Sequence, residues 1–143
     1  MGDDIVPKQG VTVGEHEKRS SSTTAQTLAA VNAAAGMLHF AKPEPFDDLI
    51  PGWLPGKART WTHASGVAEL VSAGLMAFPA TRRLGGLVTA GLYAVVWPGN
   101  MQMVANWRDK PWPMQALAWA RLPMQVWLLK QAWSAAKGDE RKS

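Results

Sequence analysis

The sequence predicts an all-α fold, a four-helix transmembrane bundle with a short interfacial segment between the first and second helices. Four long stretches of the chain carry almost no charge: residues 20–41, 60–81, 84–107 and 111–129. They hold only two charged side chains, Glu69 and Arg121. Each stretch has about the ~20 residues that a helix needs to cross a ~30 Å hydrocarbon core. Because nearly all other charges lie in the tails and connections, we expect a multi-pass membrane protein with one buried polar site.

The N-terminal part of the chain divides into a tail and a first helix. Residues 1–20 are polar and contain no long apolar run, so we expect a disordered cytoplasmic tail and no cleavable signal peptide. The serines and threonines at 20–24 can cap the first helix, which we expect to end near Phe40. The four-helix domain then occupies residues 21–136, and a second disordered tail occupies residues 137–143.

The connection at residues 42–59 contains four prolines, which exclude a continuous helix. Its apolar side chains, among them Phe46 and Trp53, predict a short amphipathic segment that covers the bundle at a membrane interface. An ordinary exposed loop is the alternative.

The other three helices are expected at residues 61–78, 84–107 and 111–135. Pro98 predicts a bend in the third helix, and the glycines of that helix predict close packing. Pro111 or Pro113 is expected to begin the fourth helix, since proline is favoured in a first turn. Basic residues are more numerous in the tails and in the turn at 82–83 than in the other connections, which places both termini in the cytoplasm.

Composition narrows the classes of function. Charged residues make up 18% of the 143 residues, below the ~25% that is usual in soluble domains. The mean hydropathy of −0.12 is low for a membrane protein, and we attribute it to the polar termini and the eight tryptophans. The absence of cysteine excludes disulfides, thiolate nucleophiles and iron–sulfur clusters. The net charge of +4 is scattered along the chain, which predicts no nucleic-acid partner.

Each long stretch carries one stripe of polar and small side chains at helical spacing, and these stripes are expected to face a shared interior. The candidate ligand-binding residues on them are His39, Glu69, Tyr93, Asn100, Arg121 and Gln125. Two charges inside a bundle are most stable when paired, so we predict an ion pair between Glu69 and Arg121. His39, Asn100 and Gln125 would complete its hydrogen bonds.

This polar layer has two interpretations. One is a site for a small polar or quinone-like ligand, because an intramembrane ionisable residue suggests function. The other is a buried pair that only fixes helix register. The spacing of the three histidines and the acidic residues predicts no metal site, and no catalytic triad or phosphate-binding glycine loop is present.

Five segments, in chain order, are similar to motifs of the DoxX-like membrane proteins: GMLHFAKPEPFDDLIPGWLP, ASGVAEL, TRRLG, VVWPGNMQM and ARLPMQ. The resemblance covers about residues 25–135. The residues that match the family's motifs are His39, Phe40, Pro43, Phe46, Pro51, Trp53, Leu54, Pro55, Ser65, Gly66, Glu69, Leu70, Pro98, Asn100, Arg121, Pro123 and Gln125. Gly99 departs from the alanine usual in the family.

The resemblance implies a four-helix protein of the bacterial cytoplasmic membrane that is associated with redox chemistry. We therefore expect a quinone-binding or accessory subunit, whose partners are the lipid bilayer and a redox enzyme. Tyr93, His39 and Glu69 would hydrogen-bond a quinone carbonyl. One alternative is a quinone-linked oxidoreductase subunit that uses His39 and Glu69 as a proton relay, and another is a structural scaffold without a ligand. The lack of cysteine and cofactor motifs argues against autonomous catalysis, and no catalytic residue is assigned.

Overall fold

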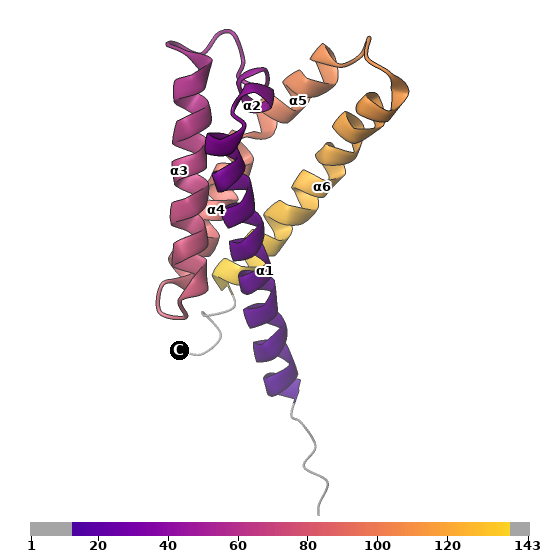
Figure 1. Ribbon diagram of the computed structural model, residues 1–143. Helices are drawn as coiled ribbons and strands as arrows, with labels where there is room; N and C mark the ends of the chain where they lie inside the picture. Colours follow the sequence, from indigo (N-terminus) through magenta and orange to yellow (C-terminus); the bar gives the residue numbers. More distant parts are fainter. Residues whose placement is uncertain (1–12, 138–143) are drawn as a thin grey trace, which may run out of the picture.

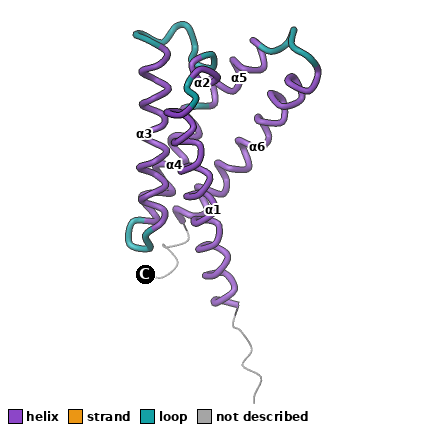
Figure 2. Tube along the Cα trace, viewed as in Figure 1, coloured by secondary structure: helices purple, strands orange, loops and turns teal. Residues whose placement is uncertain are grey.

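The computed structural model describes residues 13–137, which form α-helices and connecting turns (Figure 2). The helices are α1 (Val13–Ala41), α2 (Glu44–Asp47), α3 (Ala58–Ala77), α4 (Arg82–Val95), α5 (Trp97–Asn106) and α6 (Trp112–Lys137). The predicted all-α class is confirmed. Of the predicted tails at residues 1–20 and 137–143, residues 1–12 and 138–143 lie outside the described residues, and Lys137 is the last residue of α6.

The first helix begins earlier than the sequence predicted. α1 starts at Val13, so residues 13–20 are helical and the serine and threonine run lies inside the helix. The hydroxyl groups of Thr23 and Thr27 each donate to the backbone carbonyl four residues earlier, at 2.9 Å. Because these hydroxyls bond within the helix, they do not have to cap its end.

α1 and α3 lie side by side and approach closely where two glycines face each other (Figure 1). A Cβ atom on Gly66 would lie 2.8 Å from the Cβ of His39, and one on Gly36 would lie 3.0 Å from the Gly66 carbonyl oxygen. A larger side chain at either position would push the helices apart. This crossing sets the spacing of the side chains one turn further along each helix.

The predicted third helix is two helices, because the chain breaks at Val96. Pro98 occupies the first turn of α5, where its missing N–H is tolerated. α4 packs against α3 and α6, and Cβ atoms on Gly85 or Gly86 would collide with the backbone of Met76 or Ala136. The close packing predicted for these two glycines is confirmed, whereas a Cβ on Gly91 would meet no atom within 4 Å.

The segment between α1 and α3 covers one end of the helix pair. α2 is a single turn, and its last residue, Asp47, accepts a 2.6 Å hydrogen bond from the Thr62 hydroxyl and a 2.7 Å bond from Nε of Arg59. The hydrogen bond from Thr62 and the nearby Arg59 guanidinium lower the pKa of Asp47. A continuous helix is absent from this segment, as the prolines predicted, and Asp47 ties α2 to α3.

The interior of the protein consists of small and polar side chains. Its apolar part is mostly alanine, with Leu28, Met76 and Tyr93. Large apolar side chains are instead exposed, and Trp112 and Val95 have 78% and 76% of their surface accessible. Polar groups therefore occupy much of the space between the helices.

Between residues 13 and 137, no helix combines the length and the apolar character that crossing a membrane requires. This finding contradicts the predicted multi-pass location in the cytoplasmic membrane with cytoplasmic termini, and the transmembrane part of the predicted fold class is not supported. The prediction was wrong because it treated the lack of charge as hydrophobicity. The stretches contain few charges, but they are rich in Ala, Gly, Ser, Thr and Gln, which partition weakly into hydrocarbon.

Candidate functional site

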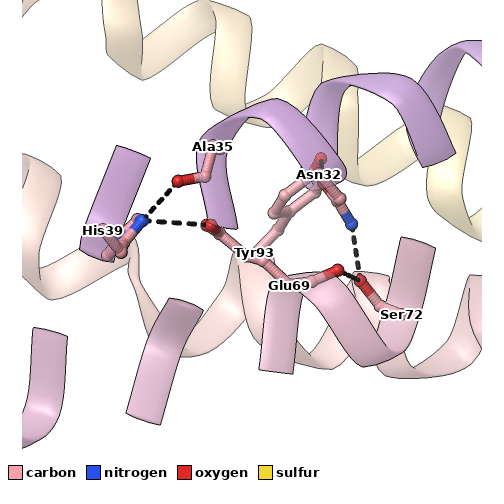
Figure 3. Close-up of polar contacts among 6 residues, drawn as sticks. All are labelled: Asn32, Ala35, His39, Glu69, Ser72 and Tyr93. Atoms are coloured by element: carbon pink, nitrogen blue, oxygen red, sulfur yellow. Dashed lines mark hydrogen bonds and ion pairs between the residues drawn. The ribbon is translucent and has the colours of Figure 1, made fainter. Parts of the chain in front are cut away.

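Asn32 on α1 is the centre of a buried hydrogen-bond network between three helices. The Tyr93 hydroxyl donates to Oδ1 of Asn32 at 2.5 Å. Nδ2 of Asn32 donates to the hydroxyl oxygen of Ser72 at 2.7 Å and lies 3.3 Å from that of Thr89. Ser72 and Thr89 are fully buried, and Asn32 is 1% exposed. Figure 3 shows Asn32 between Tyr93 and Ser72.

The hydroxyl groups around Asn32 have further acceptors. Ser72 donates to the backbone carbonyl of Glu69 at 2.8 Å, and Thr89 donates to the sulfur of Met76 at 3.5 Å. On the other side, Nε2 of Gln125 on α6 donates to the backbone carbonyl of Tyr93 at 2.6 Å. This closed end of the polar layer, formed by Asn32, Ser72, Thr89, Tyr93 and Gln125, is internally satisfied, as buried polar groups must be for stability.

His39 and Glu69 form the next part of the polar layer. Nδ1 of His39 lies 2.8 Å from the backbone carbonyl oxygen of Ala35 and 3.2 Å from Oε2 of Glu69 (Figure 3). Nδ1 of His39 carries at most one hydrogen, and this hydrogen points to the carbonyl oxygen of Ala35, which is the nearer of the two acceptors. Oε2 of Glu69 is buried and receives no directed hydrogen bond from the residues that the structure describes. The contact between the two side chains is therefore mainly electrostatic.

A residue of α2 packs against the imidazole of His39. The imidazole ring stacks on the ring of Phe46, with centroids 3.8 Å apart and planes inclined by 25°. The cap that the sequence predicted at 42–59 therefore covers His39 directly. Asp47, next to Phe46, anchors this cap to α3 through Thr62.

The charges around His39 set its protonation. Burial disfavours the imidazolium and lowers the pKa of His39, but the contact with Glu69 and the bond to Ala35 outweigh burial, so the pKa is raised above its ordinary value. The positive charge of Arg121 acts in the opposite direction. Burial, together with the negative charge of Glu69, raises the pKa of Tyr93 to about 12, so its hydroxyl stays protonated and donates to Asn32.

The predicted ion pair between Glu69 and Arg121 is not formed. Glu69 contacts His39 instead, and Nη1 of Arg121 donates to the sulfur of Met103 on α5, at 3.7 Å. The reason is the path of α6, whose first half extends away from α1 and α3 beside α5 (Figure 1). The predicted pair required the four helices to run side by side, and spacing along a helix does not show that α6 diverges.

Asn100 lies one turn before Met103 on α5. It is 7% exposed. The six candidate residues thus separate into two groups. Tyr93 and Gln125 belong to the closed end. We term His39, Glu69, Asn100 and Arg121 the open end, because Oε2 of Glu69 receives no directed hydrogen bond there from the described residues.

The part of the chain that the structure describes contains no group of three His, Cys, Asp or Glu residues that could hold a metal ion. The open end offers one carboxylate, one imidazole, one amide and one guanidinium. This set suits an organic ligand with both donor and acceptor groups.

Residues 28–136 match the model of a family described as a domain of unknown function, DUF8561. The chain belongs to the DUF8561 family. Every residue of the closed and open ends lies within the DUF8561 match. No curated protein and no solved structure matches the chain.

Membership of DUF8561 overturns the resemblance to the DoxX-like proteins. The redox association that the resemblance implied loses this support and stays an untested prediction. Each of the five segments contains, beside residues of other kinds, at least one proline or glycine. Such residues recur wherever helices pack closely and turn sharply, so the patterns reflect local geometry common to many helical proteins.

Sequence reasoning did not include Asn32, Ser72, Thr89 and Phe46 among the site residues. The signal for the first three was present in the helical spacing. Asn32 lies two turns before His39, and Ser72 lies one turn after Glu69, so each shares a stripe with a candidate residue. The position of Phe46 could not be read from spacing, because it depends on how a proline-rich connection folds back.

Proposed function

We propose that this DUF8561 protein binds a small organic molecule at the open end of its polar layer. The observation that carries the proposal is the buried Oε2 atom of Glu69, which no described residue supplies with a hydrogen bond. Nδ1 of His39 lies 3.2 Å from this oxygen and offers it charge, but its hydrogen points to the carbonyl of Ala35. A buried acceptor that lacks a directed hydrogen bond is destabilising. A ligand that donates an N–H or O–H group to this oxygen would remove that destabilisation.

The surrounding groups define the chemistry of the ligand. The guanidinium of Arg121 and the amide of Asn100 are donors, and Arg121 is near enough for its charge to act on His39. They favour a carbonyl or similar acceptor at one end of the molecule, with a donor for Glu69 at the other. Partly reduced quinones have this pattern, as do amides and hydroxy ketones. Tyr93 is not available for such a ligand, because its hydroxyl is already bound to Asn32.

A second function is supported at the closed end. Asn32 connects α1, α3 and α4 through side chains that are all satisfied. A polar network of this kind fixes the register of packed helices without any ligand. We therefore assign a structural role to the closed end and a binding role to the open end.

The experiment combines ligand discovery with a defined probe. Native mass spectrometry of the purified protein identifies retained small molecules, and isothermal titration calorimetry then measures binding of hydroquinone, of 1,4-benzoquinone and of 4-hydroxybenzamide. Binding of at least one donor-bearing probe is expected, together with a loss of about tenfold or more for Glu69→Gln or Arg121→Gln.

Glu44→Gln is the matched control, because Glu44 is 73% exposed and pairs only with Arg59. It should leave binding unchanged. If neither a retained molecule nor any probe binds, or if Glu69→Gln binds as the unchanged protein does, the open end is not a ligand site.

A further inference from the structure

A separate cleft lies between α5 and the first half of α6. It encloses about 350 Å³ and is lined by Val104, Ala105, Arg108, Gln115, Ala118 and Trp119. This volume is within the range of ~300–1,000 Å³ that small-molecule sites occupy. None of the residues assigned to the open or closed end lines this cleft, so it is a second site and independent of the proposed function.

The walls of the cleft are mainly apolar. Val104 and Ala105 come from α5, and Ala118 and Trp119 come from α6. Ala118 is 1% exposed, whereas Trp119 is 60% exposed. A ligand here would cover the face of an exposed indole and pack on a buried methyl group, which are both favourable for an alkyl chain or ring.

One cationic group lines the cleft. Arg108 lies two residues after the end of α5, and the carboxylate of the neighbouring Asp109 lies 3.6 Å from its Nε. The side chains of Arg108 and Asp109 are 79% and 89% exposed, so this pair is weak and leaves the guanidinium free to bind an anion. The loop that carries Arg108 is fixed to α6, because Nε2 of Gln115 donates to the backbone carbonyl of Lys110 at 2.8 Å.

The loop at the mouth of the cleft carries more positive than negative charge. Neither α5 nor α6 contains an acidic residue, and the loop between them carries Arg108 and Lys110. Asp48 lies near the end of α5, where Nδ2 of Asn106 donates to its backbone carbonyl, but Asp48 does not line the cleft. Asp109 is balanced by Arg108 and Lys110 on the same loop. A negatively charged group is therefore attracted to the mouth of the cleft, and a cation is repelled.

We propose that the α5–α6 cleft binds an anionic amphiphile, a molecule with a carboxylate or similar head and a medium-length apolar body. The head pairs with the Arg108 guanidinium, which favours carboxylates through two parallel hydrogen bonds. The body lies along Ala118 and Trp119. The apolar walls supply part of the affinity for any ten-carbon chain, and Arg108 adds the preference for an anionic head.

The test is calorimetric titration of the full chain with three ten-carbon probes below their aggregation concentrations: decanoate, decanol and decyltrimethylammonium. Decanoate is expected to bind one site, decanol more weakly, and the cationic probe weakest of all. Arg108→Gln should weaken decanoate about tenfold, the value of one charge-assisted hydrogen bond, and should leave decanol unchanged.

Two further variants test the walls. Ala118→Leu fills the cleft and should abolish binding of decanoate and decanol, whereas Ala120→Leu, at an exposed position two residues along α6, should not. Lys130→Gln is the charge control, since Lys130 is exposed and does not line the cleft.

Arg108 is exposed, so its variant remains informative even if Ala118→Leu does not fold. Equal binding of all three probes, or decanoate binding that Arg108→Gln does not weaken, overturns the proposal. Glu69→Gln should leave decanoate binding intact, so failure here is distinguishable from failure at the open end.

Discussion

Nδ1 of His39 lies 3.2 Å from Oε2 of Glu69, although the two side chains come from different helices separated by a proline-rich connection. Both residues follow a glycine by three positions, Gly36 on α1 and Gly66 on α3. These glycines bring the two backbones close together, and His39 packs against Gly66 within reach of the Glu69 carboxylate. The contact therefore depends on packing as much as on charge.

Replacement of Glu69 by Gln should lower the pKa of His39. The contact with Glu69 raises this pKa, while burial and the charge of Arg121 lower it, so removal of the carboxylate leaves the opposing effects in place. The measurement is an NMR titration of the His39 ring signals in the unchanged protein and in the variant.

Arg121→Gln should shift the pKa of His39 in the opposite direction, because it removes a positive charge that lowers this pKa. The pKa of His39 should therefore rise in this variant. Glu44→Gln, which alters an exposed carboxylate paired with Arg59, should change nothing. If Glu69→Gln and Arg121→Gln shift the titration in the same direction, the charges do not meet at His39 as described.

The free energy of unfolding should depend on pH in the way that the raised pKa of His39 predicts. A histidine whose pKa is raised in the folded state contributes stability fully below its unfolded pKa, about 6.5, and loses it as pH rises through the folded value. The unchanged protein should therefore gain stability relative to Glu69→Gln as pH falls from 8 to 5.5. Urea melts at several pH values measure the difference.

The pH range of the urea melts ends at 5.5 so that Asp47 does not titrate within it. The pKa of Asp47 is lowered by its hydrogen bond from Thr62 and by Arg59, so its contribution is lost only as pH falls below about 3.8. The two effects occupy separate pH ranges. A pH profile that is the same in both proteins between pH 5.5 and 8 would show that the His39–Glu69 contact does not form in solution.

Gly66→Ala should separate α1 from α3. The new Cβ would lie 2.8 Å from His39 Cβ and from a ring carbon of Phe40, so the helices must shift, at a cost of about 1–3 kcal/mol. The pKa of His39 should also move towards its ordinary value as the Glu69 contact lengthens. Thermal unfolding and NMR titration measure the two effects.

Gly74→Ala is the matched control on the same helix. A Cβ there meets no atom within 4 Å, so the variant should gain up to about 1 kcal/mol from the higher helix propensity of alanine. Equal destabilisation by both substitutions would mean that the close approach at Gly66 is not what limits the spacing of α1 and α3.

Much of the arrangement could be predicted from helical spacing. The i, i+3 and i+7 pattern placed His39, Glu69, Tyr93 and Gln125 on inward faces, and the structure buries all of them. The same pattern included Asn32, now the centre of the network. Local periodicity reports which face of a helix is buried, because that face repeats every turn.

What periodicity cannot report is how helices cross. The ion pair predicted between Glu69 and Arg121 required α3 and α6 to run alongside each other, but α6 diverges with α5 and brings Arg121 to Met103. The absence of charge was likewise not enough to identify a membrane span, since alanine and hydroxyl side chains suit tight packing between helices equally well.

The Tyr93–Asn32 hydrogen bond allows a direct measurement of the closed end. Tyr93→Phe removes the donor and leaves Oδ1 of Asn32 without a partner inside the protein, which should cost about 1–3 kcal/mol. Asn32→Leu leaves the Tyr93 hydroxyl unpaired and also removes the donor to Ser72, so its cost should be larger. The free energies of unfolding come from urea melts of both variants.

The double variant completes the thermodynamic cycle. When both partners are replaced by apolar groups, the penalty for an unpaired group at this contact disappears, so the double variant should be more stable than the sum of the two single effects implies. A coupling of about 1 kcal/mol or more is expected between residues in direct contact in one network. Thr27→Val on the exposed part of α1, combined with Tyr93→Phe, should show no coupling. Additive effects of Tyr93→Phe and Asn32→Leu would place these side chains apart in solution, and the structural role of the closed end would then have no support.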